Sequence, residues 1–169
     1  MPEHTSKQFD QELEMVRARV LQMGGLVEEQ IINAVEALST GNIDLANTVM
    51  ANDHRVNALE VGLDEECSMI IARRQPTAGD LRMLLTVIKT ITDLERIGDE
   101  AAKVARMATL IYAADRIVSP RFTEIKHMST IVLDMLRKAL DGFARLEVSN
   151  ATQIARFDEG TAHDATSRA

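Results

Sequence analysis

Residues 9–38 read FDQELEMVRARVLQMGGLVEEQIINAVEAL, and this stretch decides the fold class. Its apolar side chains recur at spacings of three and four residues, at Phe9, Leu13, Val16, Val20, Met23, Val27, Ile31, Ala34 and Leu38. Such spacing places one apolar stripe along one face of an α-helix. The stretch therefore predicts one long amphipathic helix. The pair Gly24-Gly25 inside it favours a kink or a close helix crossing, because glycine weakens a helix interior.

The same spacing returns twice further along the chain. A second stripe follows Gly41-Asn42 and ends near Arg74, and a third runs from Thr77 to about Tyr112. Pro76 stops the second helix, and Thr77 with its acidic partner three residues later has the spacing of a capping box. Three long amphipathic helices joined by short turns predict an all-α fold, with a three-helix bundle over residues 8–113.

A fourth stripe indicates that the helical pattern begins again. It follows Pro120 and runs from Phe122 to about Glu147, and a short fifth helix is expected over residues 150–157 before a frayed tail at 159–169. A shift of 105 residues lays Val27 on Val132 and Asp53 on Asp158. We therefore expect an incomplete second helical repeat over residues 118–158. Its apolar face needs cover from the first bundle or from another chain.

Composition excludes several classes of protein. The 169 residues are 46% hydrophobic, and they include only 8 Gly and 3 Pro, too few turn residues for an all-β fold. The net charge of -7 disfavours nucleic acid as a partner. No apolar run approaches the roughly 20 residues of a membrane-spanning helix, so any membrane contact is expected to pass through a partner. The single Cys67 forms no intrachain disulfide, and the N-terminus has no secretory pattern, which predicts a cytoplasmic protein.

Glu95 and Asp99 are the first candidate functional residues. They lie one turn apart on the third predicted helix, and Glu95 falls where the apolar stripe calls for a hydrophobic side chain. Buried carboxylates need a compensating charge, and carboxylate oxygens suit magnesium, manganese, calcium or oxidised iron. The alternative interpretation is structural: Asp99 pairs with Lys103 at i+4, and Glu95 lies at the rim of the stripe.

A second acidic row is expected on the preceding helix. The spacing from Val49 to Ile70 places Asp53 and Glu60 on the apolar seam, with Asn57 and Asp64 one turn after each. In an antiparallel bundle the two rows could face one another and form a carboxylate cluster. Each of these residues taken singly also fits a solvated surface.

A carboxylate-bridged metalloenzyme or a metal-storage bundle is the alternative class of function. Such bundles use a Glu-x-x-His pair from each of two helices. This chain offers the pair once, at Glu124 and His127, in positions that flank the fourth apolar stripe. Cys67 occupies a seam position typical of a small buried hydrophobe. With no phosphate loop, nucleophile elbow or Cys-His zinc spacing, the sequence predicts no enzyme.

Three segments carry a resemblance to a known family. Residues 23–28 read MGGLVE, residues 74–82 read RQPTAGDLR and residues 93–99 read DLERIGD. Over roughly residues 8–158 the chain resembles the PhoU family of bacterial phosphate-signalling proteins. Glu95 and Asp99 fall on that family's Glu-x-x-x-Asp metal signature. The resemblance in the second helix implies Asp53, Asn57, Glu60 and Asp64 as further ligands.

The resemblance implies a function as well as a fold. PhoU-like proteins contain two three-helix repeats and act as negative regulators of phosphate uptake and phosphate-starvation signalling. The resemblance implies an adaptor between the ATPase subunit of the phosphate ABC transporter and a PhoR-type sensor histidine kinase. It also implies a homo-oligomer, such as a homodimer, and bound magnesium, manganese, iron or zinc. A second Glu-Arg-Ile-Gly-Asp segment is expected downstream of Asp158, and no such segment follows.

Overall fold

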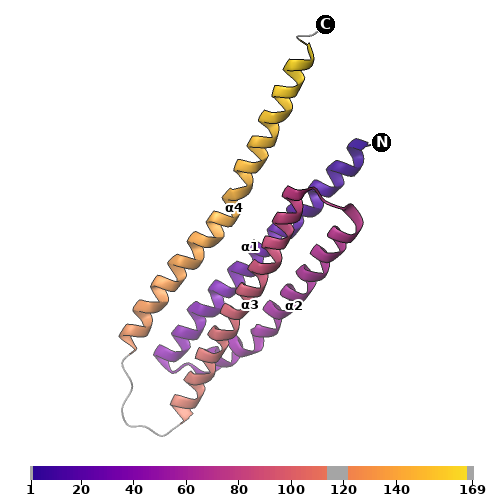
Figure 1. Ribbon diagram of the computed structural model, residues 1–169. Coiled ribbons are helices and arrows are strands. Elements are labelled where there is room, and N and C mark those ends of the chain that lie inside the picture. Colours follow the sequence, from indigo (N-terminus) through magenta and orange to yellow (C-terminus); the bar gives the residue numbers. More distant parts are fainter. Residues whose placement is uncertain (1, 114–121, 167–169) are drawn as a thin grey trace.

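Four long helices make up the structure. The computed structural model describes the backbone of residues 2–113 and 122–166, and the side chains of residues 7–113 and 122–145. The helices are α1 (Pro2–Thr40), α2 (Ile43–Arg74), α3 (Ala78–Ala113) and α4 (Thr123–Thr166) (Figure 1). All secondary structure in these ranges is helical, which confirms the all-α expectation. Within the described ranges, no helix is both long enough and apolar enough to cross a membrane.

The first three helices form the predicted bundle. Each of α1, α2 and α3 packs against the other two, and the apolar stripe of α1 lies in the shared core. The largest fully buried side chains of that core are Met23, Leu63, Leu84, Ile91, Val16, Val20, Val27, Val49, Val56, Val87 and Cys67. Burial raises the pKa of the Cys67 thiol to about 11. The thiol therefore stays protonated and packs as a small apolar group.

The turn between α1 and α2 depends on Gly41. This residue has a φ of +71°, a left-handed conformation that suits glycine, and a Cβ here would lie 2.8 Å from Cε1 of the Tyr112 ring. The Tyr112 hydroxyl donates a 3.0 Å hydrogen bond to the Leu38 carbonyl at the end of α1. Asn42 then caps α2, because its Oδ1 accepts a 3.0 Å bond from the Leu45 amide. The end of α3 is thus attached to the end of α1.

The turn between α2 and α3 begins at Gln75, which has a φ of +46° and ends α2 in the left-handed conformation. Pro76 follows it, and Thr77 precedes α3. The Thr77 hydroxyl donates a 2.7 Å hydrogen bond to the Asp80 carboxylate. The capping-box spacing therefore predicted the correct helix start and the correct pair of residues.

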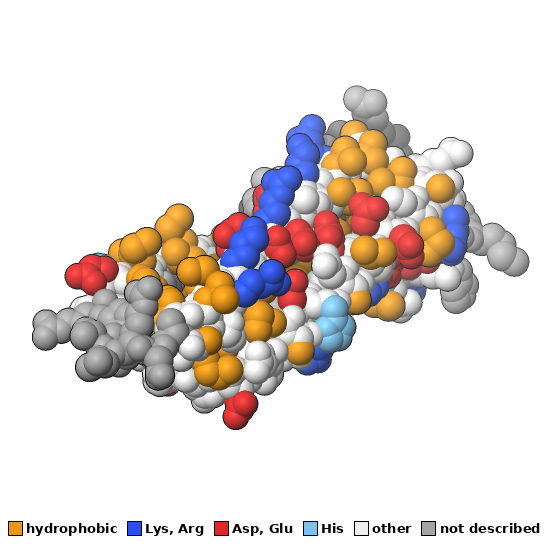
Figure 2. Space-filling view, turned by 90° about the horizontal axis from the view of Figure 1, so that it is seen from below, with side chains coloured by type: hydrophobic (Ala, Val, Ile, Leu, Met, Phe, Trp, Pro, Cys, Tyr) orange, Lys and Arg blue, Asp and Glu red, His pale blue; other side chains and the backbone are white. Residues whose placement is uncertain are grey.

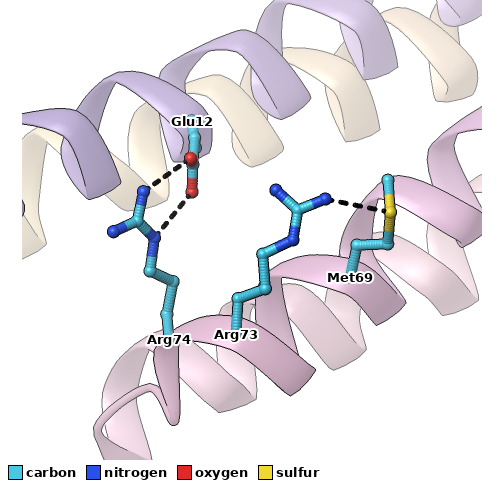
Figure 3. A network of polar contacts seen from close by, with 4 residues as sticks. All are labelled: Glu12, Met69, Arg73 and Arg74. Carbon is cyan, nitrogen blue, oxygen red and sulfur yellow. Dashed lines mark hydrogen bonds and ion pairs between the residues drawn. The ribbon is translucent and has the colours of Figure 1, made fainter.

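Two ion pairs join α1 to α2 along their length. Arg74 donates to both carboxylate oxygens of Glu12, at 2.7 Å from Nη2 and 3.2 Å from Nε (Figure 3). The hydrogen bond from Arg74 holds the pKa of Glu12 below its ordinary value. Arg73 turns back along α2 toward the Met69 sulfur, 3.2 Å away. Arg19 pairs with Glu66 further along the same two helices.

Helix α4 runs antiparallel to α1 and packs against no other helix within the described residues (Figure 1). Leu136 is buried in this contact, and four further residues are partly buried against the core: Phe122, just before α4, and Leu133, Leu140 and Phe143 of α4. Arg137 pairs with Glu28 of α1 at the rim, with 2.7 Å between Nε and Oε1. One apolar face of α4 therefore docks on the first bundle, as the sequence allowed.

Helix α4 also corrects the expected end of the chain. It continues past Glu147 to Thr166 without a break, so the separate fifth helix over 150–157 and the frayed tail from 159 are wrong as far as Thr166. The segment holds no proline, and Gly160 alone costs a helix only about 1 kcal/mol. The expected boundary between the two repeats, after residue 113, falls within residues 114–121, outside the described residues.

The Gly24-Gly25 pair has two different environments. A Cβ on Gly24 would lie 2.6 Å from both δ carbons of Leu140, whereas a Cβ on Gly25 would contact nothing within 4 Å. Gly24 thus permits the close crossing of α1 and α4 that the pair predicted. Gly25 contributes nothing to this contact.

We expect Gly25→Ala to raise the free energy of unfolding by about 1 kcal/mol, because alanine favours the helix and meets no neighbour. Gly24→Ala should give no such gain, because the new methyl displaces Leu140. Urea denaturation of the two variants measures the difference. Adding Leu140→Ala to Gly24→Ala should restore the gain relative to Leu140→Ala alone. Equal stabilisation by the two glycine substitutions would contradict the close crossing.

Candidate metal centre

The predicted ligands lie on two helices that pack against each other. Glu95 and Asp99 lie one turn apart on α3, and Asp53, Asn57, Glu60 and Asp64 follow one another along α2. Figure 2 shows acidic side chains gathered in the middle of one face of the molecule, beside a row of Lys and Arg side chains. Two helices therefore contribute to an acidic surface, as the sequence predicted.

Burial divides the six residues into two groups. Glu95, Asp99, Asp53 and Glu60 are half-buried, whereas Asn57 and Asp64 are exposed. The same four half-buried carboxyl groups interact electrostatically: burial raises the pKa of Glu95, and the charges of Glu60, Asp99 and Asp53 raise it further, with Arg96 opposing them. The structure thus brings four of the six residues into one electrostatic group. Neither Asn57 nor Asp64 is among the residues whose charges shift the pKa of Glu95.

Cations compensate this group only in part. Lys103 contacts Asp99 at 3.5 Å and Glu100 at 2.8 Å, so the i+4 pair of the structural interpretation is present. Arg96 pairs with Asp93 at 3.6 Å. Within residues 7–113 and 122–145, no ion pair involves Glu95, Glu60 or Asp53. Three half-buried carboxyl groups therefore lie close to one another without a bonded cation.

The described acidic side chains are close in space but do not form a metal-binding geometry. Among the residues whose side chains are described, no three His, Cys, Asp or Glu side chains form a group that could hold a metal ion as they stand. The carboxylates predicted as ligands lie on the packed helices α2 and α3, but they do not converge on a single point. The concentrated negative charge fits a hard cation, and coordination would require side-chain rotation of Glu95, Asp99, Asp53 and Glu60.

The Glu-x-x-His pair does not take part in this group. Glu124 and His127 are exposed on α4, a helix that packs only against α1 within the described residues. The acidic residues lie on α2 and α3. The one histidine of the metalloenzyme pattern is therefore on another element.

Gln30 belongs to this region as well, although the spacing of apolar residues does not single it out. Its side chain is buried, and neither its Oε1 nor its Nε2 has a hydrogen-bond partner among the described residues. Its Oε1 lies against Gly98, where a Cβ would be only 2.7 Å away. Gly98 sits between Glu95 and Asp99, so the buried amide supports the acidic turn from beneath. Gln30 lies three residues after Val27 and directly before Ile31, beside the α1 stripe and not on it.

A small cavity opens beside Gln30 between α1 and α2. Its volume is about 20 Å³, room for a single water-sized molecule. Its lining is Leu26, Glu29, Gln30, Asn33, Val49, Asn52, Arg55 and Val56. The cavity lacks the size of a substrate pocket.

The raised pKa of Glu95 predicts a pH dependence. Between its ordinary value of 4.5 and the raised value, the folded chain binds more protons than the unfolded chain. Stability therefore falls as the pH rises through that window. We expect metal-free Glu95→Gln to be more stable than the parent near neutral pH and to lose that advantage in acid. Thermal unfolding at a series of pH values measures this difference. The same difference for the exposed Glu36→Gln would show that the pH dependence does not come from the surroundings of Glu95.

The chain matches proteins of known family over most of its length. The model of the PhoU domain matches residues 20–108. The phosphate-specific transport system accessory protein PhoU homolog of Pseudomonas putida is 46% identical over 157 residues, which cover 92% of this chain and 60% of that protein. The phosphate-specific transport system accessory protein PhoU of Escherichia coli K12 is 42% identical over 156 residues, which cover 92% of this chain and 64% of that protein. This chain thus spans about three fifths of the length of these relatives.

Solved structures agree with these matches. The crystal structure of PhoU from Pseudomonas aeruginosa superposes with a TM-score of 0.77 at 44% identity, covering 92% of this chain and 74% of that chain. The phosphate transport system regulatory protein PhoU from Streptococcus pneumoniae gives a TM-score of 0.73 at 28% identity, with coverages of 92% and 72%. The helical bundle, the matched domain and the relatives all lead to one conclusion: this chain belongs to the PhoU family.

Proposed function

We propose that this chain is an accessory regulator of phosphate-specific transport. The observation that carries the proposal is the 46% identity to a protein named for that role, extending over 92% of the chain. The role is a negative one: the chain limits phosphate uptake and keeps phosphate-starvation signalling off. It acts in the cytoplasm, where it links the ATPase subunit of the phosphate ABC transporter to a PhoR-type sensor kinase.

The described surface supports binding rather than catalysis. The acidic group on α2 and α3 lies on the outside of the bundle, and the one cavity described in detail has room for a single water-sized molecule. An adaptor needs exposed faces that partners can contact, and long rigid helices provide them. The bundle therefore presents its charged features on fixed elements.

The second part of the proposal is a metal ion on the acidic group. Glu95 and Asp99 are its principal ligands, with Asp53 and Glu60 from α2, and the exposed Asn57 and Asp64 at its edge. The uncompensated charge around Glu95 supports a cation such as magnesium, manganese, iron or zinc. Such an ion would neutralise the carboxylates and hold α2 and α3 in one arrangement.

We expect the full chain, immobilised on a resin, to retain the purified transporter ATPase subunit and the purified PhoR-type kinase of the same organism. An ATPase subunit of an unrelated transporter from that organism serves as the matched control and should pass through. Retention of the ATPase subunit alone would contradict the proposed contact with the kinase and support the proposed role in transport. Retention of neither protein, with the chain folded by circular dichroism, would overturn the proposal.

A further inference from the structure

Helix α3 carries a regular row of cations on its solvent-exposed side. We call it the basic row: Arg82, Lys89, Arg96 and Lys103, each seven residues after the one before. All four residues are exposed, and Figure 2 shows Lys and Arg side chains in a row of this kind beside acidic side chains. Seven residues advance a helix by about 10.5 Å in almost two turns. The four cations therefore recur at regular intervals along about 30 Å of α3.

The N-terminal half of the basic row has no carboxylate of its own. Arg96 and Lys103 each pair with acidic side chains of the same helix. Among the described residues, no ion pair involves Arg82 or Lys89. Two successive cations without a carboxylate stand out in a chain whose net charge is -7. They are available to a partner that brings negative charge.

An exposed leucine lies on the same face as these two cations. Leu85 follows Arg82 by three residues and precedes Lys89 by four, so the three side chains are neighbours on the helix surface. Leu85 is 47% exposed. Helix α3 packs against α1 and α2, and no described helix covers this outer face. The three helices of the first repeat are all present, and the row lies outside the core that they share.

We propose that the basic row is the docking surface for an amphipathic helix of another protein that carries acidic residues at the same seven-residue spacing. A row with this spacing drifts by about 20° per heptad around an α-helix. A second helix that crosses at about 20° follows the drift and stays in contact with the row. An apolar side chain beside the acidic residues of that helix would contact Leu85.

The charges between the cations favour a helix over a continuous polyanion. Asp93 and Glu100 are exposed, and each lies four residues after one member of the basic row and three before the next. These carboxylates repel the dense phosphates of a nucleic acid or of an anionic membrane. A helix with one acidic residue in every seven can place its charges away from them. The proposal is independent of the regulatory function proposed above.

A designed peptide tests the match between the two helices. The probe is an alanine-based helical peptide of about four heptads, with a glutamate in every seventh position and a leucine three residues after each glutamate. The full chain should bind it in fluorescence anisotropy, and the affinity should fall as salt is added. A scrambled peptide of the same composition, whose glutamates no longer share one face, should bind about tenfold more weakly. Equal binding of both peptides, or no binding of the probe, would overturn the proposal.

Charge reversal tests the position of the site. Arg82→Glu/Lys89→Glu should raise the dissociation constant of the probe about tenfold or more, because two attractive contacts become repulsive. Arg82→Gln/Lys89→Gln should give a smaller loss in the same direction. The matched control Arg55→Glu/Lys126→Glu changes the net charge equally at exposed positions of α2 and α4 and should bind as the parent does. Circular dichroism checks that each variant is folded. Equal losses in the reversal and its control would overturn the basic row as the site.

Competition tests the class of partner. Neither duplex DNA nor vesicles of equal parts phosphatidylcholine and phosphatidylglycerol should displace the probe at matched phosphate and glutamate concentrations. Displacement by either would overturn the choice of a helix.

A fluorophore locates the probe on the chain. Attached to Thr86→Cys, beside Leu85, it should change its emission when the probe binds. Attached to Thr130→Cys on α4, it should not. Cys67 does not compete for the label, because it is fully buried. An equal response at residues 86 and 130 would overturn docking along α3.

Discussion

With excess manganese, the parent chain is expected to melt about 5–10 °C higher than without it, and the variant Glu95→Ala/Asp99→Ala is expected to show no such shift. Ion concentrations about a hundredfold above the dissociation constant stabilise a folded protein by about 2.7 kcal/mol, and each kcal/mol moves the midpoint of a chain of this size by about 2–4 °C. The effect depends on the half-buried carboxyl groups on α2 and α3.

Without metal, Glu95→Ala/Asp99→Ala should be at least as stable as the parent near neutral pH. The substitutions remove two carboxylates that repel their neighbours. The two side chains that are lost bury little apolar surface. The control Glu36→Ala/Glu65→Ala removes the same charge from two exposed positions and should keep the full manganese shift. Elemental analysis after identical purification measures the bound ion. Equal metal content in the parent and in Glu95→Ala/Asp99→Ala would contradict metal binding by these residues. It would favour the structural interpretation, in which Asp99 pairs with Lys103.

Gln30→Glu is expected to lower the free energy of unfolding by roughly 3–5 kcal/mol near neutral pH, because it places an unpaired carboxylate in the bundle core. The Gln30 amide is buried against Gly98, with no hydrogen-bond partner among the described residues. The new carboxyl group would also lie close to the acidic turn of α3. Acid should recover much of the loss, since protonation removes the buried charge.

Gln30→Met is the matched variant and should act in the opposite direction. It removes two buried polar atoms that have no hydrogen-bond partner among the described residues, at similar volume, so the free energy of unfolding should rise by roughly 1–3 kcal/mol. The repeat supports the choice, because the same shift of 105 residues lays Gln30 on Met135. Urea denaturation of both variants measures the two changes. A loss of stability in Gln30→Met would contradict an amide without a partner.

Local signals were sufficient to predict the first three helices. Glycine at a positive φ, an asparagine cap and a proline after α2 each have a specific backbone consequence, so Gly41, Asn42 and Pro76 marked the turns correctly. The end of α4 failed for the opposite reason. Ser149 and Asn150 weaken a helix without stopping it, so the fading apolar pattern after Glu147 does not mark the end of α4. Helix propensities differ by less than a kcal/mol per residue, too little to decide such an end.

The candidate site could be predicted only as far as one helix at a time. Spacing places Glu95 and Asp99 on one face of α3, and Asp53 and Glu60 on one face of α2. Whether two such rows meet depends on how each helix rotates about its axis, and packing of the whole core decides that rotation. In the structure, the four carboxyl groups influence one another electrostatically. Among the described residues they do not converge on one point that could hold a metal ion. Gln30 was missed because it lies beside the stripe, where a polar side chain is ordinarily exposed to solvent.

The single contact of α4 has a consequence for how the chain opens. Among the described residues, unfolding α1, α2 or α3 breaks contacts with at least two other helices, whereas releasing α4 breaks its interface with α1 and no other. That interface contains Leu136, Leu140 and Phe143 and the rim pair between Arg137 and Glu28. The described part of α4 is therefore a separate unit of local stability, able to detach while the bundle stays folded. Its amide hydrogens should exchange with solvent well before those of the helices that form the core.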